Sequence, residues 1–130
     1  METFTTKDSI IEILESIIIP LNFKRKGNNY IKEGPEITKK INLQKPNFSN
    51  MYYINYGYNI NALPTEDLFL HIYKRCKESN GIYLREDILR MINDIQSINS
   101  EADILKMIKM QTNINNIPLV VKKHFHLSAE

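Results

Sequence analysis

In the stretch INLQKPNFSNMYYINYGYNI, residues 41–60, two alternating runs flank a group of turn formers at 46–50, and this pattern is the strongest indication of the fold. Side chains of a β-strand point alternately to its two faces. One face of the second run carries Tyr52, Ile54, Tyr56, Tyr58 and Ile60, and the other carries Tyr53, Asn55, Gly57 and Asn59. The stretch therefore predicts two neighbouring strands, each with one apolar and one polar face.

The first run extends upstream as EITKKINLQK, residues 36–45. Its apolar face carries Ile37, Ile41 and Leu43, with Lys39 as the one polar residue among them. A lysine on an apolar face is expected near the rim of the sheet, where its ammonium group reaches water.

Two further segments complete the predicted sheet. Residues 22–33 predict a hairpin, because Gly27 and Asn28 both tolerate a positive φ between two short runs. The segment LFLHIYKR, residues 68–75, fits either a helix or a strand, and its β-branched and aromatic content favours a strand. The sequence thus predicts a hairpin plus a three-stranded meander, which gives an antiparallel sheet of four to five strands.

Helical periodicity dominates the two ends of the chain. Residues 7–19 repeat isoleucine and leucine at helical spacing until Pro20, and the same spacing recurs over 84–95 and 104–108. Residues 117–126 fit a short helix or a strand, and we favour the helix. The chain is expected to be one α+β domain over residues 1–130, with an N-terminal helix and two to three C-terminal helices packed on one face of the sheet.

Composition limits the class of protein. The 130 residues are 42% hydrophobic and carry a net charge of +2, but residues 22–45 hold seven basic residues against two acidic ones. The single cysteine, Cys76, permits no disulfide within the chain. Glu12 and Glu15 interrupt the apolar N-terminal segment, so neither a signal peptide nor a membrane span is expected. These features predict a cytoplasmic protein.

Three motifs carry a resemblance to a known family: NFKRKGNNYIK at 22–32, INLQK at 41–45 and YYINYGYNI at 52–60. Together they resemble the bacterial domain-of-unknown-function family 4304, over about residues 7–76. The matching residues are Phe23, Lys24, Lys26, Gly27, Ile41, Asn42, Leu43, Gln44, Lys45, Ile54, Asn55 and Gly57. Asn22 and Pro46 stand where the family usually has glycine and serine. The resemblance implies a small cytosolic α+β domain and implies no activity.

Common catalytic signatures are not found in the sequence. There is no glycine-rich phosphate loop, no paired-cysteine zinc pattern and no nucleophile elbow. His124 and His126 have no carboxylates beside them in sequence, and Cys76 lies among basic residues without a readable base. We therefore expect no catalytic residues, no metal and no cofactor.

The polar side of the predicted sheet is the candidate binding surface. Its residues are Gln44, Tyr53, Asn55, Asn59, His71, Tyr73 and Arg75. A basic patch is expected from Lys24, Arg25, Lys26, Lys40 and Lys45. Gly57 lies mid-strand, which often marks a bulge or a close approach of another chain or ligand. The alternative is a solvated sheet face, and alternation leaves the register between strands open.

Three functions follow from these features. The first is a protein-binding module, such as an immunity-type inhibitor of a neutral or acidic toxin encoded nearby. The second is single-stranded nucleic-acid binding, with lysines on phosphates and Tyr53, Phe69 and Tyr73 stacking on bases. The third, ranked lowest, is an enzyme that uses His71 and Arg75. The sequence leaves open whether the protein is a monomer or a homodimer.

Overall fold

A computed structural model describes residues 3–4, 7–45, 52–64, 70–79, 82–110 and 117–127. Five antiparallel strands form the main sheet, in the order β2-β3-β4-β5-β6. The strands are β2 (Lys24–Lys26), β3 (Asn29–Glu33), β4 (Ile37–Gln44), β5 (Tyr53–Ile60) and β6 (Ile72–Arg75). Spatial order equals chain order, so the predicted hairpin and meander are confirmed. The predicted turn at 46–50 lies outside the described residues.

The hairpin and the register follow from the residue types. Gly27 has a φ of +62°, in the left-handed region that glycine adopts without cost, and it turns β2 into β3. Asn42 lies opposite Asn55, and Asn55 lies opposite Arg75. Polar residues thus meet polar residues across the strands, and Ile41 meets Tyr56 on the other face.

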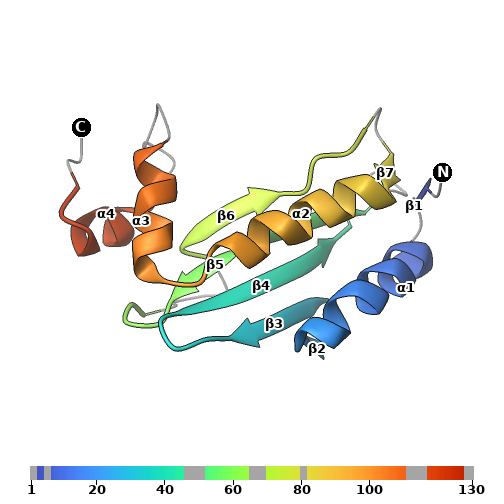
Figure 1. Ribbon diagram of the computed structural model, residues 1–130, viewed down its shortest axis with the longest axis horizontal. Helices are drawn as coiled ribbons and strands as arrows, with labels where there is room; N and C mark the ends of the chain where they lie inside the picture. The colour runs from blue at the N-terminus through green and yellow to red at the C-terminus, as the bar shows by residue number, and fades with distance from the viewer. Residues whose placement is uncertain are drawn as a thin grey trace.

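Helices cover one face of this sheet. The helices are α1 (Lys7–Ile18), α2 (Arg85–Ser97), α3 (Glu101–Lys109) and α4 (Leu119–His124), with a 3-10 turn η1 (Ile19–Leu21) after α1. In Figure 1, α1 and α2 lie in front of the sheet, and α3 and α4 stand beyond the end of α2. Pro118 is the N-cap of α4, so the preference for a short helix at 117–126 is confirmed. Among the described residues, no helix is long and apolar enough to cross a membrane.

The core lies between the sheet and these helices. Its fully buried members include Ile10, Leu14, Ile18, Tyr30, Ile37, Ile41, Ile54, Tyr58, Ile60, Ile88 and Ile95. The buried tyrosines keep their hydroxyl groups hydrogen-bonded at the margin, since Tyr30 donates to Glu15 of α1 and Tyr58 donates to the main chain of Asp94 in α2. The tyrosines at 56 and 58 are therefore core residues of the sheet.

The prediction that Lys39 lies near the rim of the sheet is wrong. Its residue is only 5% exposed, and its ammonium group donates to Oδ1 of Asn99, 2.7 Å away in the turn between α2 and α3. Burial, and then the nearby charge of Lys32, lower the pKa of Lys39. The helices extend far enough along β4 to cover this lysine, which alternation within the strand does not reveal.

A second, two-stranded sheet was not predicted. β1 (Thr3–Phe4) pairs with β7 (Tyr83–Leu84), immediately before α2. Two-residue strands carry too little alternation to be recognised in a sequence.

Candidate functional site

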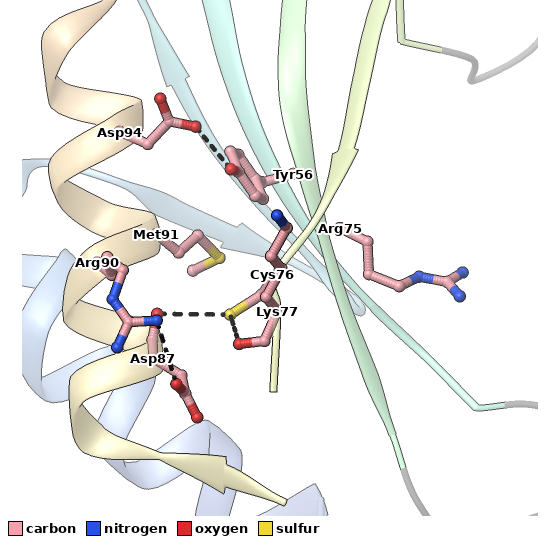
Figure 2. Close-up of a pocket in the computed structure, with 8 residues that line it drawn as sticks. All are labelled: Tyr56, Arg75, Cys76, Lys77, Asp87, Arg90, Met91 and Asp94. Atoms are coloured by element: carbon pink, nitrogen blue, oxygen red, sulfur yellow. Dashed lines mark hydrogen bonds and ion pairs between the residues drawn. The ribbon is translucent and has the colours of Figure 1, made fainter. Parts of the chain in front are cut away.

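The strand register arranges the polar residues in rows that run across the sheet. One row joins Lys26, Asn29, Asn42, Asn55 and Arg75. The next row joins Lys24, Ile31, Lys40, Gly57 and Tyr73. Both rows project from the face opposite α1 and α2, which we call the open face. In Figure 2, Arg75 points away from α2, whereas Tyr56 points toward it.

Arg75 lies at the centre of a cluster of neutral partners on the open face. Its Nε donates to Oδ1 of Asn55 at 2.9 Å, and its Nη2 donates to Oε1 of Gln44 at 3.2 Å and to the hydroxyl of Tyr73 at 3.3 Å. Its guanidinium carbon lies 4.0 Å from the ring centroid of Tyr53. No carboxylate among the described residues pairs with Arg75, so its charge is held in place but not neutralised.

A chain of side-chain amides supports this arginine. Asn55 is only 3% exposed, and its Nδ2 donates to Gln44 at 2.8 Å and makes a longer contact of 3.5 Å with Asn42. Asn42 in turn donates to Asn29 at 2.8 Å. The amides span β3 to β5 and are hydrogen-bonded to one another, which orders the surface around Arg75.

Four of the predicted site residues therefore form one contiguous cluster with Arg75: Gln44, Tyr53, Asn55 and Tyr73. Asn29 and Asn42 complete it and were not among the predicted site residues. Asn42 shares the parity of Gln44 within β4, and that alternation was the signal for it. Asn29 could be assigned to the cluster only from the register of β3 on β4, which the sequence does not supply.

His71, a predicted member of the binding surface, lies at the end of the β5–β6 ladder and not in the cluster around Arg75. His71 is 6% exposed, its Nδ1 accepts a hydrogen bond from the Ile60 N–H at 2.8 Å, and its Nε2 lies 3.0 Å from the carbonyl of Pro64. Asn59 accepts a hydrogen bond from the main-chain N–H of His71 at 2.9 Å. Both residues thus close the end of the β5–β6 ladder, and both ring nitrogens of His71 already have main-chain partners.

Gly57 is explained by the packing of the sheet itself. A Cβ at this position would lie 1.9 Å from the carbonyl oxygen of Ile72 in β6. The close approach that a mid-strand glycine indicates is therefore made by the neighbouring strand, and Gly57 lends no support to a ligand.

The predicted basic patch divides into separate parts. Arg25 is tied to Glu15 of α1 at 3.0 Å, and its guanidinium lies 5.9 Å from the Tyr30 ring. Lys24 and Lys26 are exposed and line a hollow of about 460 Å³ at the β2 edge. Lys40 lies mid-sheet on the open face, and Lys45 is exposed just after β4.

A hollow of about 230 Å³ lies on the opposite side, between the end of β6 and α2 (Figure 2). Tyr56 donates to Oδ2 of Asp94 at 2.6 Å, and Lys74 donates to the same oxygen at 3.0 Å. Cys76 is 3% exposed, and burial, followed by the charge of Asp87, raises the pKa of its thiol to about 12. A protonated, buried thiol is a poor nucleophile, so this hollow offers no cysteine chemistry.

Asp87 is the buried carboxylate of this region, and sequence reasoning did not single it out. It accepts hydrogen bonds from the N–H and hydroxyl of Ser79 and from the Leu84 N–H, at 2.8–3.1 Å. Burial alone would raise the pKa of Asp87, but these hydrogen bonds outweigh burial and lower it. The carboxylate fixes the start of α2 and is fully engaged there, which is a structural role.

Metal binding finds no support in the part of the chain that the structure describes, where no group of three histidine, cysteine or acidic side chains could hold an ion. His124 instead lies 2.6 Å from Oε1 of Glu101 and joins α4 to α3.

The fold and the site together define an α+β domain with an antiparallel meander, helices on one face and a polar, arginine-centred surface on the other. The family model described as a domain of unknown function, DUF4304, matches residues 14–122, and the chain belongs to this family. The resemblance carried by the motifs at 22–32, 41–45 and 52–60 is thus confirmed. No curated protein and no solved structure gives a match.

Proposed function

We propose that this protein is a protein-binding module of the immunity type, which inhibits a toxin by docking the open face of its sheet onto an acidic surface. The observation that carries the proposal is Arg75, an exposed guanidinium stacked on Tyr53 and hydrogen-bonded only by neutral groups among the described residues. Arginine and tyrosine dominate the energetics of protein interfaces, particularly where they are already ordered before binding.

The chemistry of the open face favours a carboxylate on the partner. A guanidinium presents its donors in a planar fork that fits a carboxylate. Lys40 lies two strands away on the same face, and Lys24 and Lys26 lie at its β2 edge, so the face is basic beyond Arg75. A basic face steers an acidic partner during encounter.

The test is co-expression with the product of the adjacent open reading frame, followed by co-purification and by neutralisation of that product in cells. Arg75→Ala should weaken the complex at least about tenfold, because it leaves a partner carboxylate buried without its cation. Arg75→Lys keeps the charge but loses the stacked fork and should give an intermediate affinity.

Lys109→Ala is the matched control, since Lys109 is exposed near the end of α3, away from the open face. If no neighbouring product co-purifies and none is neutralised, the proposal fails. Equal loss of affinity in the Arg75 and Lys109 variants would also exclude the open face as the docking surface.

Single-stranded nucleic acid is a second candidate, favoured by the row that joins Lys24, Lys40 and Tyr73 across the sheet. Against it, the guanidinium of Arg75 covers one face of the Tyr53 ring, where a base would stack. Phe69, the third predicted stacking residue, lies outside the described residues. Fluorescence polarisation with labelled oligonucleotides tests this candidate, because phosphate contacts make affinity fall steeply as salt is raised. Absent or salt-independent binding excludes it.

A further inference from the structure

Within the described residues, β6 is the last strand of the main sheet, and its outward main-chain groups have no partner there. In an antiparallel ladder, alternate residues bond to the neighbouring strand and the residues between them point away. The N–H of Cys76 donates to the carbonyl of Ile54, which shows which residues of β6 bond to β5. The main-chain N–H and C=O groups of Ile72 and Lys74 therefore point toward β5, whereas those of Tyr73 and Arg75 point away from the sheet. Among the described residues, nothing bonds to the N–H or C=O of Tyr73 or Arg75.

The opposite edge, on β2, is protected in a way that the β6 edge is not. Lys24, Arg25 and Lys26 are all exposed there, and exposed basic side chains discourage an edge strand from pairing with another chain. The basic side chains of β6 are directed elsewhere. Lys74 pairs with Asp94 on the helix side at 3.0 Å, and Arg75 folds back over Asn55 on the open face.

We propose that β6 pairs antiparallel with β6 of a second copy of this chain, which joins the two sheets into one. A two-fold axis brings the β6 edges of two copies together in antiparallel orientation, so each edge can complement the other. Three alignments of one β6 strand on the other would let their outward N–H and C=O groups bond to each other. A register centred on Tyr73 requires the N–H of His71, which already donates to Asn59. A register centred on Arg75 places two guanidinium groups directly opposite each other, which is repulsive.

The remaining register, centred on Lys74, is favourable on both faces. On the open face, each Tyr73 lies opposite the Arg75 of the other copy, so no like charges are directly opposite each other on that face. On the helix side, the two Lys74 side chains meet, and each is neutralised by its own Asp94. All four outward N–H groups find carbonyl acceptors, two from each copy.

Apolar side chains lie beside the start of β6. A hollow of about 360 Å³ lies between the start of β6 and the start of α4, lined by Ile72, Tyr73, Ile117 and Pro118 among others. Tyr73, on this edge, is 56% exposed. Pairing through four-residue strands buries a small area, which predicts a weak dimer with a Kd of about 10–100 μM.

Sedimentation velocity of the full chain over a range of concentrations measures the dimer, and hydrogen exchange locates it. Tyr73→Pro removes an outward N–H without removing any bond to β5, and should raise the Kd more than about tenfold. Tyr73→Ala, which keeps that N–H, should raise it less. The amides of Tyr73 and Arg75 should exchange more slowly as dimer forms, and the outward amide of Arg25 on β2 should not change.

A chain that stays monomeric to about 1 mM overturns the proposal. So does a dimer in which the amides of Tyr73 and Arg75 exchange as fast as in the monomer. Because the exchange measurement uses the unmodified protein, it decides the question even if Tyr73→Pro prevents folding. The result is independent of the toxin proposal, since neither the probe nor the readout involves another protein.

Discussion

Tyrosines of the same strand, β5, have different roles on the two faces of the sheet. On the helix side, Tyr56 and Tyr58 are buried and their hydroxyl groups bond to α2. On the open face, Tyr53 makes no hydroxyl bond to any described residue and supports the guanidinium of Arg75 instead. The comparison teaches that strand parity, rather than residue type, decides whether a tyrosine stabilises the fold or orders a surface.

The largest expected effect is unfolding at alkaline pH, caused by ionisable groups that are buried on the helix side of the sheet. Burial, as the leading cause, raises the pKa of Tyr30, Tyr56, Tyr58 and Tyr83 above 10.0, and it raises that of Cys76 from 9.0 to about 12. Groups whose folded pKa is raised stabilise the protein fully below their unfolded pKa and lose that contribution as pH rises toward the folded value. The contribution of these five groups to stability should therefore be constant up to about pH 9 and fall above it.

Tyrosinate absorbance and circular dichroism, recorded together against pH, check this prediction. Four of the seven tyrosines should ionise only together with the loss of secondary structure. Complete tyrosine ionisation in a protein that keeps its circular dichroism would show that these hydroxyl groups are not buried.

The next largest effect tests how closely β5 and β6 approach. Gly57→Ala forces a Cβ to within 1.9 Å of the Ile72 carbonyl and should cost about 4 kcal/mol in the free energy of unfolding. Gly27→Asn is the control, because Asn tolerates the positive φ and a Cβ there meets nothing within 4 Å. Urea denaturation measures both variants. Similar losses in the two would mean that the strands do not meet at Gly57.

A smaller effect on the free energy of unfolding compares the two faces directly, through two tyrosines of β5. Tyr56→Phe removes a hydrogen bond to the carboxylate of Asp94 and should cost about 2 kcal/mol. Tyr53→Phe should cost less than about 0.5 kcal/mol, because no described residue bonds to its hydroxyl. If Tyr53→Phe proves to be the more destabilising variant, the assignment of the two faces is inverted.

Only a small effect on stability is expected at Arg75, the residue with the largest expected effect on binding. Arg75→Ala should lower the free energy of unfolding by less than about 1 kcal/mol, since Arg75 is exposed and its hydrogen bonds compete with water. A loss of several kcal/mol would assign Arg75 to the fold, and a weakened complex would then not locate the docking surface.

Much of this architecture was predictable from alternation and helical spacing. The period of two in 52–60 separated Tyr56 and Tyr58 from Tyr53 and Asn55, and the spacing in 7–19 located α1. These patterns are local, because each side chain's face depends only on its own strand or helix.

What the sequence did not reveal depends on contacts between elements. The stacking of Arg75 on Tyr53 required the register of β5 on β6. His71 has the parity of the open face, but β6 begins one residue later, so its ring serves the main chain of Ile60. Lys39 was predicted at the rim because the sequence of β4 does not show how far along the strand the helices cover it.

The agreement between spatial and chain order has a consequence for how the molecule assembles. Each main-sheet strand pairs with the one made just before it, so the sheet can grow by short loop closures while the chain emerges from the ribosome. The pairing of β1 with β7 is the exception, because it joins Thr3 to Leu84. This pairing has to wait until all five strands of the main sheet have been made, and we therefore expect it to form after the main sheet.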